Sequence, residues 1–196
     1  QLRRHHLLVM DKPLNLLRRT NEPSSREVEL TAHGRALANS QDPSNILETV
    51  LSEVRFASIP WCSEDRAERY REFDVPVYEA MKRVLVASDS YVDRDEFDFF
   101  VSRVRSLGEV DWAVDAIGMY RQLSTEQQTA LRGEVKDRIH GEKAYANWRD
   151  VGLHTFSLFS LGTSMVRDGT LLRLTNNWTA VHAGEGPQAK AAVPEL

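Results

Sequence analysis

A short run with strand character interrupts a chain that is otherwise patterned for helices. In "SMVRDGTLLRLT" (164–175), two apolar runs flank Asp168-Gly169, and an Asp-Gly pair in that position is a strong signal for a tight β-hairpin. Arg173 alternates with a leucine on each side, which predicts leucines facing a core and Arg173 facing outward. A two-stranded hairpin alone is marginally stable in water, so this one must pack against helices. The chain is therefore constrained to a helical fold that a hairpin closes.

A second run of this kind lies near the N-terminus. The segments "LNLLRRT" (14–20) and "REVELT" (26–31) flank the turn-rich "NEPSS", which predicts a β-hairpin with a five-residue loop. Val28 and Leu30 would share one face of that hairpin, and "AHGRALANS" after it is predicted as a short helix. Both runs end in Leu-Thr after a hairpin, so the chain repeats one local pattern.

Apolar residues recur at helical spacing through most of the remaining chain. The segments predicted as helices are 43–56, 77–88, 93–108, 109–123, 124–141 and 142–162. Polar residues are expected to cap three of them at the N-terminus: Ser44, then Asp93 with Glu96 three positions later, and Ser124 with Gln127 three positions later. The chain is therefore predicted to be mostly helical.

The fold class expected from these elements is mainly α with short β-hairpins, arranged as winged-helix-like domains with extra helices. Winged-helix domains are built from a set of helices that a two-stranded hairpin closes. We expect a partial winged-helix-like unit at 1–57, a linker region at 58–75, a winged-helix-like helical domain at 76–180 and a flexible tail at 181–196. The alternative is an irregular helical domain with two unrelated hairpins.

Composition gives this chain no global basic signature. It is 41% hydrophobic and 28% charged, as in ordinary globular proteins, and its formal net charge is −4. Any contact with nucleic acid would therefore use a local patch. Residues 1–35 hold seven lysines and arginines against four acidic residues, which fits either an anionic partner or a solvated basic face.

The cysteine count and the chain start bear on where the protein works. Cys62 is the only cysteine, so no disulfide forms within the chain, which favours a reducing, cytoplasmic compartment. No run of about 18 apolar residues is present to span a membrane, so no membrane partner is expected. Because the chain begins with Gln1, we expect a fragment or processed product, and a catalytic domain could lie outside it.

The segments "REVELTAHGRALANS" and "LFSLGTSMVRDGTLLRLT" resemble the recognition modules of type IIS restriction endonucleases of the FokI and AlwI kind. The first is similar to the Leu-Thr-x-x-Gly-x-x-Leu segment that closes those modules, and the second to the helix and wing that precede it. The matched positions are Leu30, Thr31, Gly34 and Leu37 in the first copy, and Leu158, Leu161, Gly162, Leu174 and Thr175 in the second.

This resemblance implies duplex DNA as the partner, with a helix in the major groove and a wing near the backbone. Arginines suit phosphates and guanine edges, and those on the two hairpins are Arg18, Arg19, Arg26, Arg167 and Arg173. Short donors suited to phosphates are Thr163, Ser164 and Asn176. Polar candidates for base contacts on the helix before the wing are Asn147, Arg149, His154 and Thr155. The alternative for each is an ordinary surface residue.

No catalytic centre, cofactor or metal site is predicted in this chain, and whether the protein is an enzyme is left open. Glu134 and Lys136 match the tail of a metal-dependent nuclease signature, but they lie in a helical pattern where side chains two apart diverge. Three other groups lack the partners and spacing of a metal site: His5-His6, Cys62, and Asp93 with Asp95 and Asp98. No glycine-rich phosphate loop is present.

The aromatic residues mostly follow the apolar stripes and are predicted to form core, not a base-stacking surface. They are Phe97, Phe99, Phe100, Trp112, Phe156 and Phe159. Phe99 lies off the stripe of its own helix and is a candidate for a partner surface. The function expected is a DNA-recognition module of a restriction or other DNA-processing protein. The alternative is a helical protein-interaction or oligomerisation domain, in which a partner domain or a second copy is bound.

Overall fold

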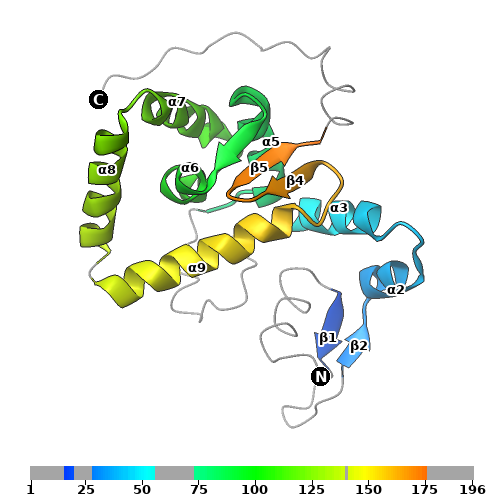
Figure 1. The fold of residues 1–196 in the computed structure, drawn as a ribbon. Helices are drawn as coiled ribbons and strands as arrows, with labels where there is room; N and C mark the ends of the chain where they lie inside the picture. The colour runs from blue at the N-terminus through cyan, green and yellow to red at the C-terminus, as the bar shows by residue number, and fades with distance from the viewer. Residues whose placement is uncertain (1–15, 20–27, 56–72, 140, 176–196) are drawn as a thin grey trace.

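The computed structural model describes residues 16–19, 28–55, 73–139 and 141–175. Figure 1 shows helices that surround a small sheet, with a separate hairpin near the N-terminus. The predicted fold class, mainly α with short β-hairpins, is confirmed. Among these described residues, no helix is long and apolar enough to cross a membrane. Most of the predicted linker region and all of the predicted tail lie outside them.

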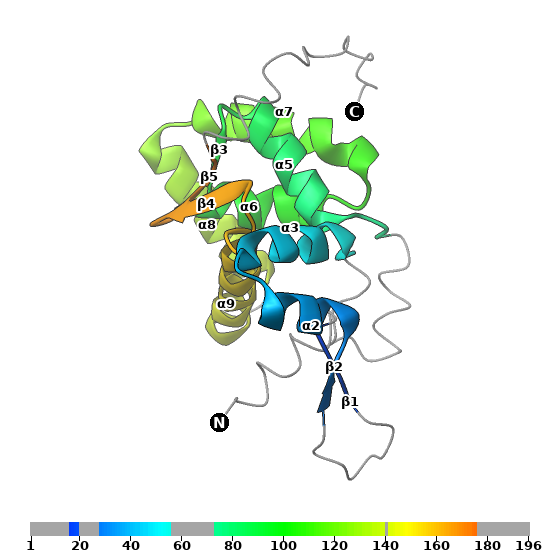
Figure 2. The same cartoon turned by 90° about the vertical axis from the view of Figure 1, so that its right-hand side faces the viewer.

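The first hairpin forms as predicted. β1 (Leu17–Arg19) pairs antiparallel with β2 (Val28–Leu30), and its loop lies outside the described residues. α2 (Ala32–Asn39) follows directly, because the Thr31 hydroxyl accepts a 3.1 Å hydrogen bond from the Gly34 amide and so caps the helix. In both views the β1–β2 hairpin extends away from the main body, whereas α2 packs beside α3 (Figures 1 and 2).

α3 (Pro43–Glu53) begins two residues earlier than its predicted cap requires. Asp42 occupies the N-cap position and Pro43 the first turn, so the prediction that Ser44 caps this helix is wrong. The physical reason is the proline, whose fixed φ and missing N–H suit the first turn of a helix. α3 then brings Val50 and Leu51 into the main core.

A strand that the sequence analysis missed follows α5 (Val77–Ala87). Asp89 and Ser90 take left-handed φ values of 58° and 63°, which turn the chain sharply into β3 (Tyr91–Asp93). A strand of three residues is too short to carry a readable alternation, and two consecutive left-handed residues without glycine are uncommon.

α6 (Arg94–Phe99) starts as predicted and ends early. Asp93 and Glu96 form the expected capping box, each side chain bonding the other residue's amide at 2.8 Å. The prediction of one helix over 93–108 is wrong. α6 ends at Phe99, and a 3₁₀ turn, η2 (Val101–Arg103), follows it. Phe97 and Phe99 are buried on two sides of α6, in two different cores, and Val101 of η2 is buried as well.

The next three helices surround α6 (Figure 1). After the 3₁₀ turn η3 (Leu107–Glu109) they are α7 (Val110–Arg121), α8 (Thr125–Arg138) and α9 (Glu142–Phe159). The predicted capping box of α8 is confirmed, since the Ser124 and Gln127 side chains each bond the other's backbone N–H. The predicted segments 109–123 and 124–141 are thus each a helix, and 142–162 holds one long helix.

The second hairpin becomes part of a three-stranded antiparallel sheet. β4 (Met165–Asp168) and β5 (Leu171–Leu174) are joined by Gly169 and Thr170, so the turn lies one residue later than the Asp168-Gly169 pair. Gly169 has φ +59°, as the first central residue of a tight hairpin turn requires. β5 lies in the middle, between β4 and β3, with strand order β3-β5-β4.

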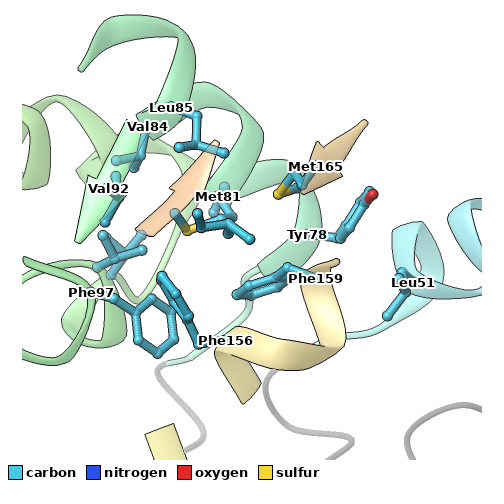
Figure 3. Close-up of a cluster of buried hydrophobic side chains, with 14 of the residues drawn as sticks. Leu51, Tyr78, Met81, Val84, Leu85, Val92, Phe97, Phe156, Phe159 and Met165 are labelled. Atoms are coloured by element: carbon cyan, nitrogen blue, oxygen red, sulfur yellow. The ribbon is translucent and has the colours of Figure 1, made fainter. Parts of the chain in front are cut away.

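One hydrophobic core joins the sheet, α5, α9 and α3 (Figure 3). Met81 on α5 and Phe97 on α6 lie among aromatic residues of α9, with Phe97 and Phe156 ring centroids 5.4 Å apart. Leu51 of α3 contributes to the same core as Tyr78 and Met165. Residues on both sides of the predicted 58–75 linker therefore share one core, and the division into separate domains stays a prediction.

A second, smaller core lies between α6, α7, α8 and α9. Phe99 is its centre, only 2% exposed, and its ring stacks on that of Trp148 at 6.2 Å and 10°. The prediction of Phe99 as a partner surface is therefore wrong, because α6 buries residues on two sides. The prediction of Trp112 as core is wrong as well, since its side chain is 49% exposed on α7.

Candidate nucleic-acid interface

The outward face of α9 carries a row of polar side chains. Lys143, Asn147, Asp150 and His154 are all exposed, and their spacing of four, three and four residues places them on one side of the helix. His154 Nε2 lies 3.5 Å from Asp150 Oδ2. Asn147 has no hydrogen-bond partner in the described part of the chain, so its amide is available to a ligand.

Arg167 connects the β4–β5 hairpin to this face. Its guanidinium donates to the hydroxyl of Ser157 on α9 at 2.6 Å and to the Gly169 carbonyl in the turn at 2.9 Å. Ser157 lies three residues beyond His154, so Arg167 continues the α9 row onto the hairpin. The side chain remains exposed, and its remaining N–H groups can reach a ligand.

Arg173 lies on the exposed side of β5, as the alternation predicts, while Leu172 and Leu174 are buried. Its guanidinium lies 5.4 Å from the centroid of the Tyr91 ring and 3.8 Å from the carboxylate of Asp168. Arg173 is thus held against the sheet by weak contacts at the surface, where such pairs contribute little.

Thr163 and Ser164, predicted as phosphate contacts, bond to a carboxylate of the protein itself. The amides of Thr163 and Ser164 donate to Glu48 Oε2 on α3 at 2.8 and 3.1 Å, and the Ser164 hydroxyl donates to Oε1. The Tyr78 hydroxyl completes the set at 2.5 Å. Burial alone would raise the pKa of Glu48, but the hydrogen bonds from Ser164 and Tyr78 hold it below its ordinary value.

This carboxylate fixes the loop that joins α9 to the hairpin. A Cβ on Gly162 would collide with the Tyr78 hydroxyl and the Glu48 carboxylate, so glycine is required for this close approach. Thr175 also closes the base of the hairpin, because its amide donates to the Ser164 carbonyl at 2.9 Å. α3 therefore sets the angle at which α9 meets the hairpin.

Arg149, predicted as a base contact, turns inward. Its Nη1 lies 2.8 Å from Asp95 Oδ1 and 2.7 Å from Asp98 Oδ2, so it pairs with two acidic residues of α6. Arg94 adds a second cation to Asp98 at 2.8 Å and donates to the backbone carbonyl of Arg149. Gly152 permits this approach, since a Cβ there would collide with Asp98.

Asp98 is almost fully shielded from solvent, with its side chain 2% exposed. Burial raises the pKa of Asp98 to about 6, although Arg94 and Arg149 oppose the shift. Arg132 on α8 pairs with Asp95 at 2.5 Å. Ion pairs from α6 therefore connect α8 and α9.

A second buried ion pair fixes α7. The side chain of Glu96 is 2% exposed and receives Arg121 Nε and Nη2 at 2.6 and 3.0 Å. Arg121 also donates to the carbonyls of Ser88 and Tyr91, so it holds the left-handed turn before β3. This role could not be predicted from the sequence, because a pair of residues 25 apart leaves no local signal.

The other predicted site residues are placed in part. Thr155 on α9 is half-buried. Arg18 and Arg19 lie on β1, but their side chains lie outside what is described, as do Arg26 and Asn176 entirely. The structure thus brings Asn147, His154 and Arg167 into one row, and adds Lys143, which the sequence analysis missed. Its only signal was the four-residue spacing to Asn147.

The two residues that match a nuclease signature lie on a helix, as the sequence pattern predicts. Glu134 and Lys136 lie on α8, and Lys136 pairs with Glu142 at 2.6 Å. Within the described ranges, no three His, Cys, Asp or Glu side chains are grouped to hold a metal ion.

Compared with models of known protein families and with curated protein sequences, the chain gives no match.

Proposed function

We propose that residues 77–175 form a winged-helix-like module that binds duplex DNA through the outward face of α9 and the β4–β5 hairpin. The observation that carries this proposal is the strand order β3-β5-β4, with α9 leading directly into the hairpin. A winged-helix domain has this order: a helix, a strand, further helices and then a closing hairpin. One strand of that hairpin pairs with the first strand. α7 and α8 are additions to that order.

The contacts expected with DNA follow from the exposed groups. Asn147 can bond the adenine edge in two places, and Asp150 can accept from the cytosine amino group. Lys143 and Arg167 supply positive charge for phosphates on the α9 side. Arg173 lies opposite Val166 in the register, so it would reach phosphates only from the other face of the hairpin. The resemblance to restriction endonuclease modules adds the proposal that this module serves a DNA-processing protein whose catalytic centre lies elsewhere.

The test is a fluorescence anisotropy titration of the full chain with a pool of duplexes of diverse sequence. The two cations on the α9 side, Lys143 and Arg167, predict that log K falls with log salt with a slope of about −2. The same titration on single strands should give weaker binding, because a groove is needed for α9. Absence of binding to the duplex pool at about 50 mM salt would refute the proposal.

A second candidate function has one observation in its favour, an exposed apolar pair on α7. Trp112 is 49% and Met119 65% exposed, and seven residues separate them along one face of the helix. Asp111 and Asp115 are exposed beside them and have no ion-pair partner in the described ranges. This face supports the alternative of a protein-interaction or oligomerisation domain.

Sedimentation velocity of the chain and of a Trp112→Lys, Met119→Lys variant separates the two functions. Concentration-dependent association that the variant abolishes would favour the interaction domain. A monomer at all concentrations, with duplex binding that the variant retains, would favour the DNA-binding module, because the α7 face is distinct from α9 and the hairpin.

A further inference from the structure

A hollow of about 380 Å³ opens beside the second core, between η2, α8 and α9. Four of its lining residues are apolar, and two of these are aromatic: Phe73, Val135, Ile139 and Trp148. The other four are polar or charged: Asp98, Ser102, Arg103 and Arg138. A smaller hollow of about 80 Å³ adjoins it and shares Val135 with it. The combined size falls in the range of small-molecule sites. Trp148 is fixed here by its stacking on Phe99.

Two arginines that line both hollows form no side-chain ion pair or hydrogen bond with the residues that the structure describes. They are Arg103 from η2 and Arg138 from the end of α8, and both are exposed. Every other arginine side chain described on α5 to α9 is paired, which makes these two unusual. The wall also contains Asp98, whose charge is already matched by Arg94 and Arg149.

The acidic groups nearby do not neutralise the two cations. Glu134 lines the smaller hollow, four residues before Arg138 on α8, yet no ion pair within 4.0 Å joins them. The Asp98 carboxylate is already paired with Arg94 and Arg149. The hollow therefore combines an apolar interior with two arginines at its edge that no described acidic side chain pairs.

The geometry points to this hollow as a binding site for a small amphipathic anion, with an aromatic body against Trp148 and Val135 and an oxyanion held by Arg103 and Arg138. The guanidinium fork suits a carboxylate or a phosphate by two parallel hydrogen bonds. An aromatic body gains apolar burial and ring contacts against Trp148. This site does not depend on the proposed DNA binding, since none of its cations belongs to the α9 row.

The test is titration of the isotopically labelled chain with 1-naphthaleneacetate, followed by the indole N–H signals in two-dimensional NMR. Trp148→Phe assigns the signal in the hollow, and Trp112 on the exposed α7 face serves as an internal control. The expected result is a saturable shift at Trp148 without one at Trp112, with a Kd of about 1 mM or tighter. The neutral 1-naphthaleneacetamide should bind about tenfold more weakly, because it lacks the oxyanion.

Two variants separate the site from general charge attraction. Arg103→Gln with Arg138→Gln should weaken binding by about tenfold, whereas Lys143→Gln, outside the hollow, should leave it unchanged. A parallel titration with 1-naphthyl phosphate shows which oxyanion the two arginines prefer, and inorganic phosphate alone should not shift Trp148. The inference is overturned by no shift at Trp148, by equal affinity for acid and amide, or by a double variant that binds like the parent.

Discussion

The guanidinium of Arg149 on α9 lies 2.7 Å from the carboxylate of Asp98 on α6. This pair connects the helix with the candidate DNA-binding face to the buried centre of the fold. An arginine in such a place is a structural residue first, and its substitution tests folding before it tests recognition.

Replacement of Arg149 by methionine should therefore destabilise the protein. Asp95 and Asp98 would lose a shared cation in a poorly hydrated site, which costs about 3 kcal/mol of unfolding free energy. Urea denaturation followed by circular dichroism measures this cost, and Lys143→Met on the exposed face of α9 is the matched control, with a change below about 0.5 kcal/mol. Equal stability of the two variants would contradict the structural role.

The buried carboxylate of Asp98 should give the stability a distinctive pH dependence. Because burial raises the pKa of Asp98 to about 6, the folded state holds this proton more strongly than the unfolded state does. The contribution is fully present below the unfolded pKa, near 4, and is lost as pH rises through about 6.

The stability of the parent relative to Asp98→Asn should therefore fall by about 2 kcal/mol between pH 4 and pH 6.5. Denaturant unfolding of both proteins across this range gives the difference, in which other titrating groups cancel. A difference that stays flat, or that rises with pH, would show that the two arginines outweigh burial at Asp98.

Removal of the Glu48 carboxylate should loosen the loop before the hairpin. Glu48→Ala leaves the donors of Tyr78, Thr163 and Ser164 without their acceptor, which we expect to cost about 2 kcal/mol. Glu53→Ala, on the exposed end of the same helix, should cost far less. Thermal unfolding compares the two, and similar losses would refute a special role for Glu48.

The hairpin turn should reject a side chain at Gly169. Its φ of +59° places Gly169→Ala in the left-handed region, at a cost of about 1 kcal/mol in unfolding free energy. Nothing lies within 4 Å of the added Cβ, so the cost comes from the backbone alone. Gly169→Asn should therefore be milder than Gly169→Ala, because asparagine tolerates this conformation, and the reverse order would contradict the assignment of the turn.

Features with a local cause could be predicted from the sequence. The Asp93–Glu96 and Ser124–Gln127 capping boxes each depend on residues three apart, and both formed. The β4–β5 hairpin and the outward side of Arg173 followed from alternation around a glycine turn. β3 could not be predicted, because it becomes a strand only by pairing with β5, about 80 residues later.

The candidate site was predictable only in outline. Asn147, His154 and Arg167 were identified by residue type, and the structure gathers them along α9 and the hairpin. Arg149 and Ser164 are equally suitable donors for DNA by residue type. In the structure Arg149 instead forms an ion pair with Asp98, and Ser164 donates a hydrogen bond to Glu48. Residue type alone could not separate the two groups, because the partners come from α6 and α3, distant in sequence.

The most direct measurement of the central proposal is the duplex affinity of Arg167→Gln against that of Arg83→Gln. Both substitutions remove one exposed arginine charge, but only Arg167 adjoins the α9 row. The proposal predicts that Arg167→Gln weakens binding about tenfold and makes the salt slope shallower by about 1, whereas Arg83→Gln changes neither. A parent that binds no duplex, or two variants that bind alike, would contradict it.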